Sequence, residues 1–255
     1  MTSVKPLVFL CLCLIPAFHS FLNYKNSHEW TKLILTHHWP HTFCTMEKTS
    51  CQTADQFNYW TLHGFWPNKG GMCNHSWHFN VTNIESLLPD MKRYWPDLLH
   101  PNSTLLWKHE WVKHGTCAAY LESMNTQYKY FAKSLEMYKE IHLDNTLLKF
   151  NIVPSEKTYS LKEIREAILN YYQVAPKIQC VLPSQGEQVQ LLGQIEICVD
   201  KQFQYTNCSE PAEDLPDSNV DIPAFESTAA AELHVCDESI AVLYPPVSTK
   251  LWRLS

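Results

Sequence analysis

The chain is short of long apolar runs and of positive charge. Outside Leu7–Ile15, a run of nine residues that is too short to cross a bilayer, no segment approaches the roughly 18 apolar residues of a membrane span. We therefore expect a protein with no stable membrane insertion. Lys and Arg number 20 against 26 Asp and Glu, a formal net charge of −6. Nucleic-acid-binding proteins are ordinarily basic, so this balance at neutral pH argues against binding through charge alone.

Residues 1–20 have the pattern of a secretory signal peptide. Lys5 precedes the apolar run, and Pro16 and Ala17 begin a less apolar stretch where cleavage can fall. Four sequons agree with export and predict solvated, glycosylated loops at Asn74, Asn80, Asn102 and Asn207. We expect a glycoprotein of the secretory pathway that is held in the lysosome lumen, secreted, or both.

Histidine is abundant, and rigid residues outnumber flexible ones. Six glycines stand against 15 prolines and nine tryptophans, which predicts rigid loops and much flat aromatic surface. Without Lys5 and His19 the chain has a charge of −7 and twelve histidines, so the net charge moves towards +5 near pH 5. We infer a field that reverses sign in an acidic compartment. The alternative is a neutral-pH protein with incidental surface histidines.

Eight cysteines remain once Cys11 and Cys13 leave with the signal. An even number in an oxidising compartment predicts four disulfides, although the count alone allows 105 pairings. Free thiols in the core are the alternative. The eight are Cys44, Cys51, Cys73, Cys117, Cys180, Cys198, Cys208 and Cys236.

The hydrophobic periodicity and the positions of Pro, Gly and capping residues predict a single α+β domain over residues 21–255, with no repeat and no linker. Strands are expected at Lys32–Trp39, Tyr59–Trp66, Lys177–Leu182, Gln194–Val199 and Ile240–Tyr244. Helices are expected at Ile84–Leu88, Leu105–His114, Asn125–Ile141 and from Ser160 onward. Local signals set their ends: Pro40 stops the first strand, Asn83 caps the first helix and Pro89 ends or kinks it, Gly115 ends the second, and Ser160 with Glu163 forms a capping box. The acidic segment Glu210–Glu232 is expected to be a surface excursion.

Two blocks about fifty residues apart concentrate the chemistry. Residues 60–67 read Trp-Thr-Leu-His-Gly-Phe-Trp-Pro, and residues 108–117 read Lys-His-Glu-Trp-Val-Lys-His-Gly-Thr-Cys. In the first block Gly64 permits close approach of another group, and Trp66 is expected to stack on a base or line a cleft. In the second block, residues four apart share a face of a regular α-helix. Glu110 should therefore orient His114 and raise its pKa, while Lys113 lies beside His109 and can hold a phosphate oxygen.

A zinc site is the obvious rival, because His109 and Glu110 begin the metalloprotease pattern H-E-x-x-H. Here His114 comes one residue too late. Five residues of α-helix turn through about 500°, which leaves the two imidazoles roughly 140° apart. On this geometry we expect no metal and no cofactor.

Two histidines without a metal can still split a phosphodiester that carries its own nucleophile, as RNA does in its 2′-OH. One imidazole removes the 2′-OH proton while the other protonates the 5′-oxygen leaving group, giving a 2′,3′-cyclic phosphate. DNA lacks the hydroxyl and is excluded. One histidine must be neutral and the other charged, which predicts a bell-shaped pH profile; a carboxylate that favours the imidazolium would make the optimum acidic.

Residues 63–67 and 109–117 resemble the two active-site segments of the ribonuclease T2 family, secreted or lysosomal acid endoribonucleases with little base specificity. The resemblance runs from His28 to Pro246 and is greatest to the animal lysosomal members. It implies a catalytic domain with an antiparallel sheet flanked by helices; separately, we expect a monomer. A secreted glycoprotein with a non-catalytic signalling or binding role on the same fold is the alternative.

The resemblance also implies roles, residue by residue. His114 is the general base and His63 the general acid, Glu110 and Lys113 stabilise the transition state, and His109 helps to hold the phosphate. The implied disulfides are Cys44–Cys51, Cys73–Cys117, Cys180–Cys236 and Cys198–Cys208. The chain departs from the family at two positions near expected base-contacting surface, Phe65 for leucine and His37 for glutamine.

Overall fold

The computed structural model describes residues 29–46, 51, 54–183, 188–208 and 232–247. The expected signal peptide and nearly all of the acidic segment 210–232 lie outside these residues. Within them, no helix combines the length and apolarity that crossing a bilayer requires.

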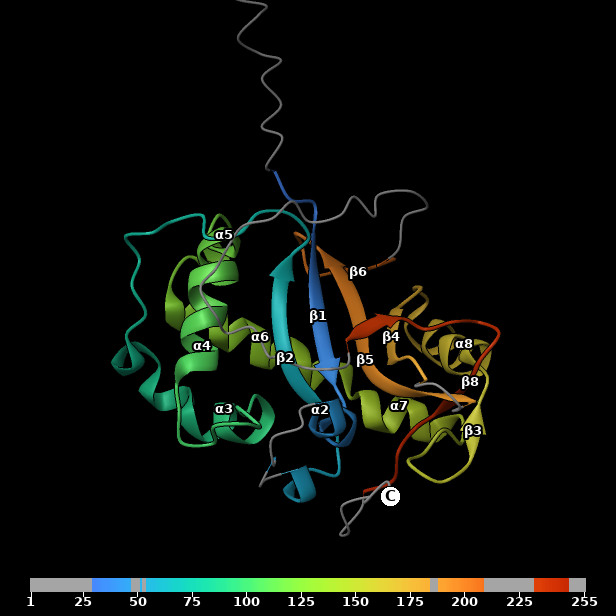
Figure 1. The fold of residues 1–255 in the computed structure, drawn as a ribbon. Helices are drawn as coiled ribbons and strands as arrows, with labels where there is room; N and C mark the ends of the chain where they lie inside the picture. Colours follow the sequence, from blue (N-terminus) through green and yellow to red (C-terminus); the bar gives the residue numbers. More distant parts are fainter. Residues whose placement is uncertain (1–28, 47–50, 52–53, 184–187, 209–231, 248–255) are drawn as a thin grey trace, which may run out of the picture.

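Helices and strands alternate irregularly along the chain (Figure 1). The strands are β1 (Lys32–His38), β2 (Thr61–Pro67), β3 (Thr158–Tyr159), β4 (Lys177–Val181), β5 (Val189–Asp200), β6 (Tyr205–Thr206), β7 (Leu233–Val235) and β8 (Ala241–Leu243). The α-helices are α2 (Pro40–Met46), α3 (Leu88–Tyr94), α4 (Leu105–Glu110), α5 (Thr116–Ala118), α6 (Gln127–Ile141), α7 (Leu143–Lys149) and α8 (Leu161–Tyr172). The other helical turns are η1 (Ala54–Gln56), η2 (Val81–Leu87), η3 (Trp111–Gly115) and η4 (Glu122–Met124).

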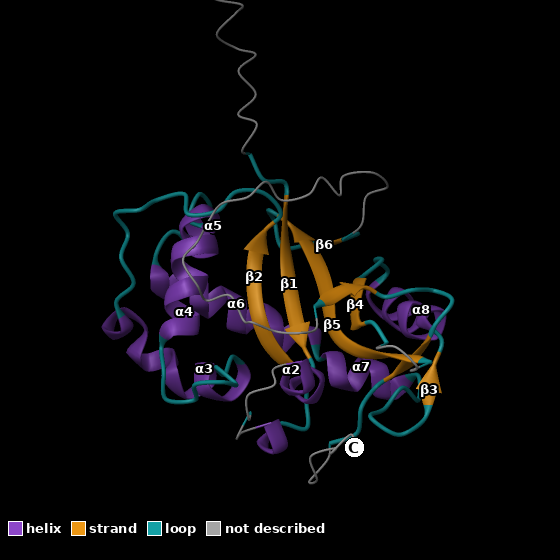
Figure 2. Ribbon diagram, in the orientation of Figure 1, coloured by secondary structure: helices purple, strands orange, loops and turns teal. Residues whose placement is uncertain are grey.

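The sheet runs in the order β2-β1-β5-β4-β7, with every neighbouring pair antiparallel. The short β8 is the exception, since it lies parallel to one end of β5. Helices α6 and α7 lie behind the sheet in the view of Figure 2, α3 and α4 lie beyond its β2 edge, and α8 lies towards the other side. The predicted α+β domain with an antiparallel sheet flanked by helices is therefore confirmed.

Side chains that alternate along β1 and along β2 form a core face and a polar face of the sheet. Leu33 and Leu35 of β1 and Leu62 and Phe65 of β2 are fully buried in the core. A β-bulge between Thr36 and His37 shifts the register of β1 against β2. Beyond the bulge the ring of His38 stacks on that of His63, with centroids 5.1 Å apart. The bulge thus places two imidazoles together beside the site described below.

Local signals were reliable where they were unambiguous. Ser160 caps α8 through the predicted capping box with Glu163, and α6 follows the expected range within two residues of its start. The predicted cap at Asn83 is wrong, because Asn80 caps η2 by accepting from the backbone N–H of Thr82. Pro89 lies next to the break between η2, which ends at Leu87, and α3, which begins at Leu88. It lies in the first turn of α3, where its missing N–H has no helical partner to lose.

The four disulfides join the same cysteines as the resemblance implies. Cys73–Cys117 is the one nearest the two blocks, since it ties the loop that follows β2 to α5. Of the sequon asparagines, Asn80, Asn102 and Asn207 are exposed and Asn74 is half-buried.

Candidate active site

The second block does not form a regular α-helix. Helix α4 passes without a break into a π-helical turn, η3, and then into α5. The predicted end at Gly115 is wrong, because the helical backbone continues to Ala118. A π-turn closes its hydrogen bonds over five residues, so residues five apart come to lie on nearly the same face. His109 and His114 accordingly approach each other, with ring centroids 6.2 Å apart.

Contacts from within the helix and from a neighbouring loop accompany this wide turn. The hydroxyl of Thr116 donates to the carbonyl of Val112 at 2.9 Å, and the backbone N–H of Met72 donates to the carbonyl of Lys113 at 2.9 Å. Gly115 lies against Trp111 so closely that a Cβ there would be 2.5 Å from the indole. Polar groups of the widened turn are thereby satisfied by partners, one of which comes from the loop held by the Cys73–Cys117 disulfide.

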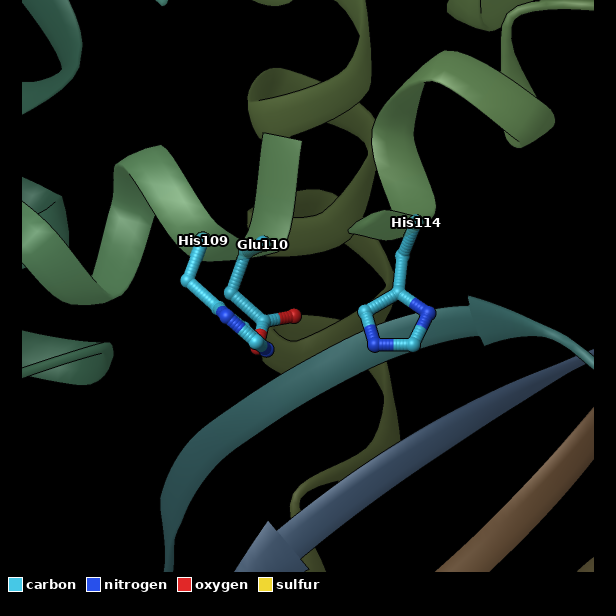
Figure 3. Close-up of side chains that lie close together, drawn as sticks. All are labelled: His109, Glu110 and His114. Atoms are coloured by element: carbon cyan, nitrogen blue, oxygen red, sulfur yellow. The ribbon is translucent and has the colours of Figure 1, made fainter. Parts of the chain in front are cut away.

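The predicted 140° separation of His109 and His114 is therefore wrong. One ligand-type atom from each of His109, Glu110 and His114 lies within 4.8 Å of the others. Figure 3 shows the three side chains pointing from the helix towards strand β2. Two imidazoles and a carboxylate are a set that Zn²⁺ accepts. Helix geometry thus gives no reason to exclude a cation. Activity measured in the presence of a chelator tests whether catalysis needs one.

Trp66 of the first block contacts histidines of both blocks. Its ring is 5.0 Å from that of His63, edge to face, and 5.0 Å from that of His114, stacked at 29°. Its indole N–H donates to Glu110 Oε2 at 2.6 Å. A Cβ on Gly64 would lie 2.0 Å from the indole nitrogen and 2.6 Å from the same carboxylate oxygen, so glycine is required for the close approach predicted there. Base stacking by Trp66 stays a prediction, and in the structure the indole already stacks on an imidazole.

Glu110 is 1% exposed, and burial raises the pKa of its carboxyl to about 8 against the opposing effects of the Trp66 hydrogen bond and the Lys113 charge. The carboxyl is therefore protonated at acidic and neutral pH. We expected Glu110 to pair with His114 and raise its pKa, and this is wrong. Burial first, and then the charges of Lys113, His109 and His63, hold the pKa of His114 well below its usual value.

His63 is held at three points. The indole N–H of Trp95 donates to its carbonyl at 2.7 Å, its ring stacks on His38, and its Nδ1 lies 3.0 Å from Gln194 Oε1. Burial lowers the pKa of His63, the hydrogen bond with Gln194 opposes that effect, and the charge of Lys113 adds to it. Neither Trp95 nor Gln194 was identified from the sequence. They lie 32 and 131 residues from His63, and no local pattern marks them.

The six predicted site residues come together. His109 and Lys113 are half-buried, and burial together with the charges of Lys113 and His63 lowers the pKa of His109. The side chains at the two departures from the family pattern, Phe65 and His37, are 0% and 1% exposed. Their expected effect on base preference stays a prediction.

Comparison with known proteins identifies the family of this chain. A model of the Ribonuclease T2 family matches residues 30–208. Ribonuclease T2 of Danio rerio is 56% identical over 219 residues, which cover 86% of this chain and 89% of that protein. The crystal structure of human RNase T2 matches with a TM-score of 0.71 and 44% identity, covering 85% of this chain and 99% of that one. A mutant of RNase MC1 in complex with 5′-GMP matches with a TM-score of 0.64 and 25% identity, covering 71% and 95%.

An α+β fold of this kind, with its histidine-rich polar face and relatives of this identity, defines an endoribonuclease. More particularly, the chain belongs to the ribonuclease T2 family.

Proposed function

We propose that this protein cleaves single-stranded RNA without a metal, through a 2′,3′-cyclic phosphate, by the concerted action of His63 and His114. One observation carries the proposal. Two imidazoles from different elements, a strand and a helix, flank the same indole, and Lys113 is close enough to perturb the pKa of both. A phosphodiester placed before Trp66 would meet a proton acceptor on one side and a proton donor on the other.

In the proposed step, neutral His114 takes the proton from the 2′-OH as the 2′-oxygen bonds to phosphorus. The bond from phosphorus to the 5′-oxygen breaks, and protonated His63 supplies the proton that this oxygen needs. The proton count balances, since one imidazole gains the proton that the other loses. General acid and general base steps each contribute about 10²–10⁴ in rate.

The remaining groups stabilise the negative charge that develops on the phosphate during the reaction. Lys113 supplies a fixed positive charge, and His109 adds a second nitrogen on the same face of the helix. Glu110 has a pKa of about 8, so below neutral pH it carries a proton that it can donate to a non-bridging phosphate oxygen. Its Oε2 is meanwhile held by the Trp66 indole. An ionised carboxylate there would repel the phosphate.

The pH profile should be bell-shaped, with its maximum below about 6.5. The base must be deprotonated and the acid protonated, so the maximum lies between their two pKa values. Burial lowers both values below the ordinary 6.5, which moves the whole bell to acidic pH. This reason differs from the carboxylate effect inferred from the sequence. The test is RNA cleavage from pH 4 to 8 in EDTA, with product ends identified and DNA as the control substrate.

We expect cyclic phosphate ends, full activity in EDTA and no cleavage of DNA. An absolute requirement for added Zn²⁺ would instead support a metallohydrolase built on His109, Glu110 and His114. An optimum above pH 7 would contradict the roles of the two lowered imidazole pKa values. A solved relative, the RNase MC1 mutant, was crystallised with 5′-GMP, which supports a ribonucleotide polymer as the substrate class.

We also propose that the chain follows the secretory pathway to the lysosome or outside the cell. The apolar N-terminal segment, the four disulfides and the placement of the sequons support this route. The mass of protein expressed in animal cells, measured before and after glycosidase treatment, should show loss of about twenty N-terminal residues and N-linked glycans. An intact N-terminus without glycans would contradict the proposal.

A further inference from the structure

A row of polar side chains crosses the sheet behind His63. Gln194 on β5 is paired in register with Gln179 on β4 and with His38 on β1. Gln194 is 5% exposed, and both halves of its amide are engaged. Its Oε1 faces His63 Nδ1 at 3.0 Å. Its Nε2 donates to Gln179 Oε1 and, at 3.2 Å, to Glu196 Oε1.

The chemistry of these partners sets the direction of each hydrogen bond. An ionised Glu196 carboxylate accepts hydrogen bonds and has none to donate, so the group facing it is the amide nitrogen of Gln194. The amide oxygen of Gln194 is then left facing His63. An oxygen can only accept there, so Nδ1 of His63 must carry the proton. In the neutral ring, Nε2 is then the nitrogen with the free lone pair.

We propose that Gln194 is a positioning residue that holds His63 in the Nδ1–H tautomer, so that Nε2 is the atom that exchanges the proton with the leaving group. Glu196 and Gln179 hold the amide in the required orientation, and Trp95 fixes the backbone of His63. The inference rests on the proposed role of His63. It adds that Nε2 of His63 is the nitrogen that transfers the proton, and that Gln194 selects the tautomer.

An amide at this position has a second consequence. The titratable groups near His63 include Lys113 and His114 of η3, His109 of α4, and His38 of β1. Lys113 is cationic and the imidazoles become cationic when they are protonated, so these groups disfavour the protonated form of His63. The neutral Gln194 oxygen stabilises the imidazolium only by a hydrogen bond, so His63 is oriented while its pKa stays in the acidic range. A carboxylate in the same place would orient the ring but raise its pKa.

The test compares Gln194→Leu and Gln194→Glu with the wild type and with Gln190→Leu. Gln190 is a matched control, because it is a buried glutamine on the same strand whose amide bonds the backbone of Asp237 and Ile240 instead of the site. The readouts are kcat, KM and the pH profile for a dinucleotide substrate, and the ¹⁵N shifts of His63. The His63 signals are those that disappear in His63→Phe.

We expect the wild type to show neutral His63 protonated on Nδ1, and Gln194→Leu to change this to Nε2 with kcat lowered about 10–100-fold and KM little changed. Gln194→Glu should keep the Nδ1–H form and move the alkaline limb up by about 1–3 pH units. Gln190→Leu should keep the wild-type tautomer and profile. A wild-type His63 protonated on Nε2, or a Gln194→Leu variant that keeps Nδ1–H, would overturn the inference. If the tautomer switches while kcat is unchanged, the positioning contact stands and the proposed role of His63 as the acid fails.

Discussion

Replacement of either His63 or His114 with phenylalanine is expected to reduce RNA cleavage to a small residual rate. Each residue carries one proton transfer in the proposed step, and such a transfer is worth about 10²–10⁴ in rate. Phenylalanine keeps a planar ring of similar size against Trp66, so the fold should survive. The measurement is kcat/KM on RNA at pH 5, with circular dichroism to confirm folding. His234→Phe is the control, since His234 is exposed on β7 at the opposite edge of the sheet from β2.

The residual rates of the two variants should separate their roles. Without the base, the rise of rate with increasing pH disappears, and only the fall through the pKa of the acid remains. Without the acid, the rise remains and the fall disappears. We expect His114→Phe to lose the acidic limb and His63→Phe to lose the alkaline limb. The reverse pattern would exchange the two roles, and retained wild-type activity in either variant would remove the two-histidine mechanism.

Glu110→Gln is expected to stabilise the protein at neutral and alkaline pH and to leave its stability unchanged near pH 4. Burial raises the pKa of Glu110 from 4.5 to about 8 in the folded protein. A raised carboxyl pKa contributes stability that is fully present below the unfolded value and is lost as pH rises through the folded value. At 1.36 kcal/mol for each pKa unit, the loss above pH 8 reaches up to about 5 kcal/mol. Glutamine is uncharged, like the protonated acid, so the variant does not lose this stability as pH rises.

The measurement is the free energy of unfolding in urea between pH 4 and pH 9, taken as the difference between variant and wild type. Taking the difference removes the opposite contribution of the buried histidines, whose lowered pKa values destabilise the fold as pH falls. Glu163→Gln is the control. Hydrogen bonds from Ser160 lower the pKa of exposed Glu163, so its contribution is lost as pH falls, in the opposite direction. A difference for Glu110→Gln that is the same at pH 4 and pH 9 would contradict a protonated carboxyl.

Sequence reasoning succeeded where an element depends on its own residues. The capping box of Ser160 and Glu163 satisfies backbone donors within one turn, so the start of α8 can be read locally. Proline and asparagine were ambiguous for the same local reason. Asn80 and Asn83 are both able to cap, and Pro89 is tolerated in a first turn as readily as it ends a helix. The choice between such alternatives is made by packing against other elements, which the local sequence does not contain.

The π-turn shows the same limit at the site itself. Residues 105–114 predict a regular helix, and on that helix His109 and His114 face apart. The wide turn instead takes donors from Thr116 and from Met72, whose position follows from the disulfide between Cys73 and Cys117. It also lies where Gly115 lets Trp111 approach closely. These contacts accompany the turn that brings His109, Glu110 and His114 together.

The sequence by itself determined the class of the protein and the identity of its reactive groups, because residue types and their order along two short blocks are local facts. It named His63, Trp66, His109, Glu110, Lys113 and His114. Only the tertiary structure decided their ionisation and their directions. Burial protonates Glu110 and lowers the pKa values of both histidines, the ring of Trp66 lies against both imidazoles, and Gln194 reaches His63 from 131 residues away. Desolvation and hydrogen bonding depend on which groups surround a side chain in space, and folding alone supplies those neighbours.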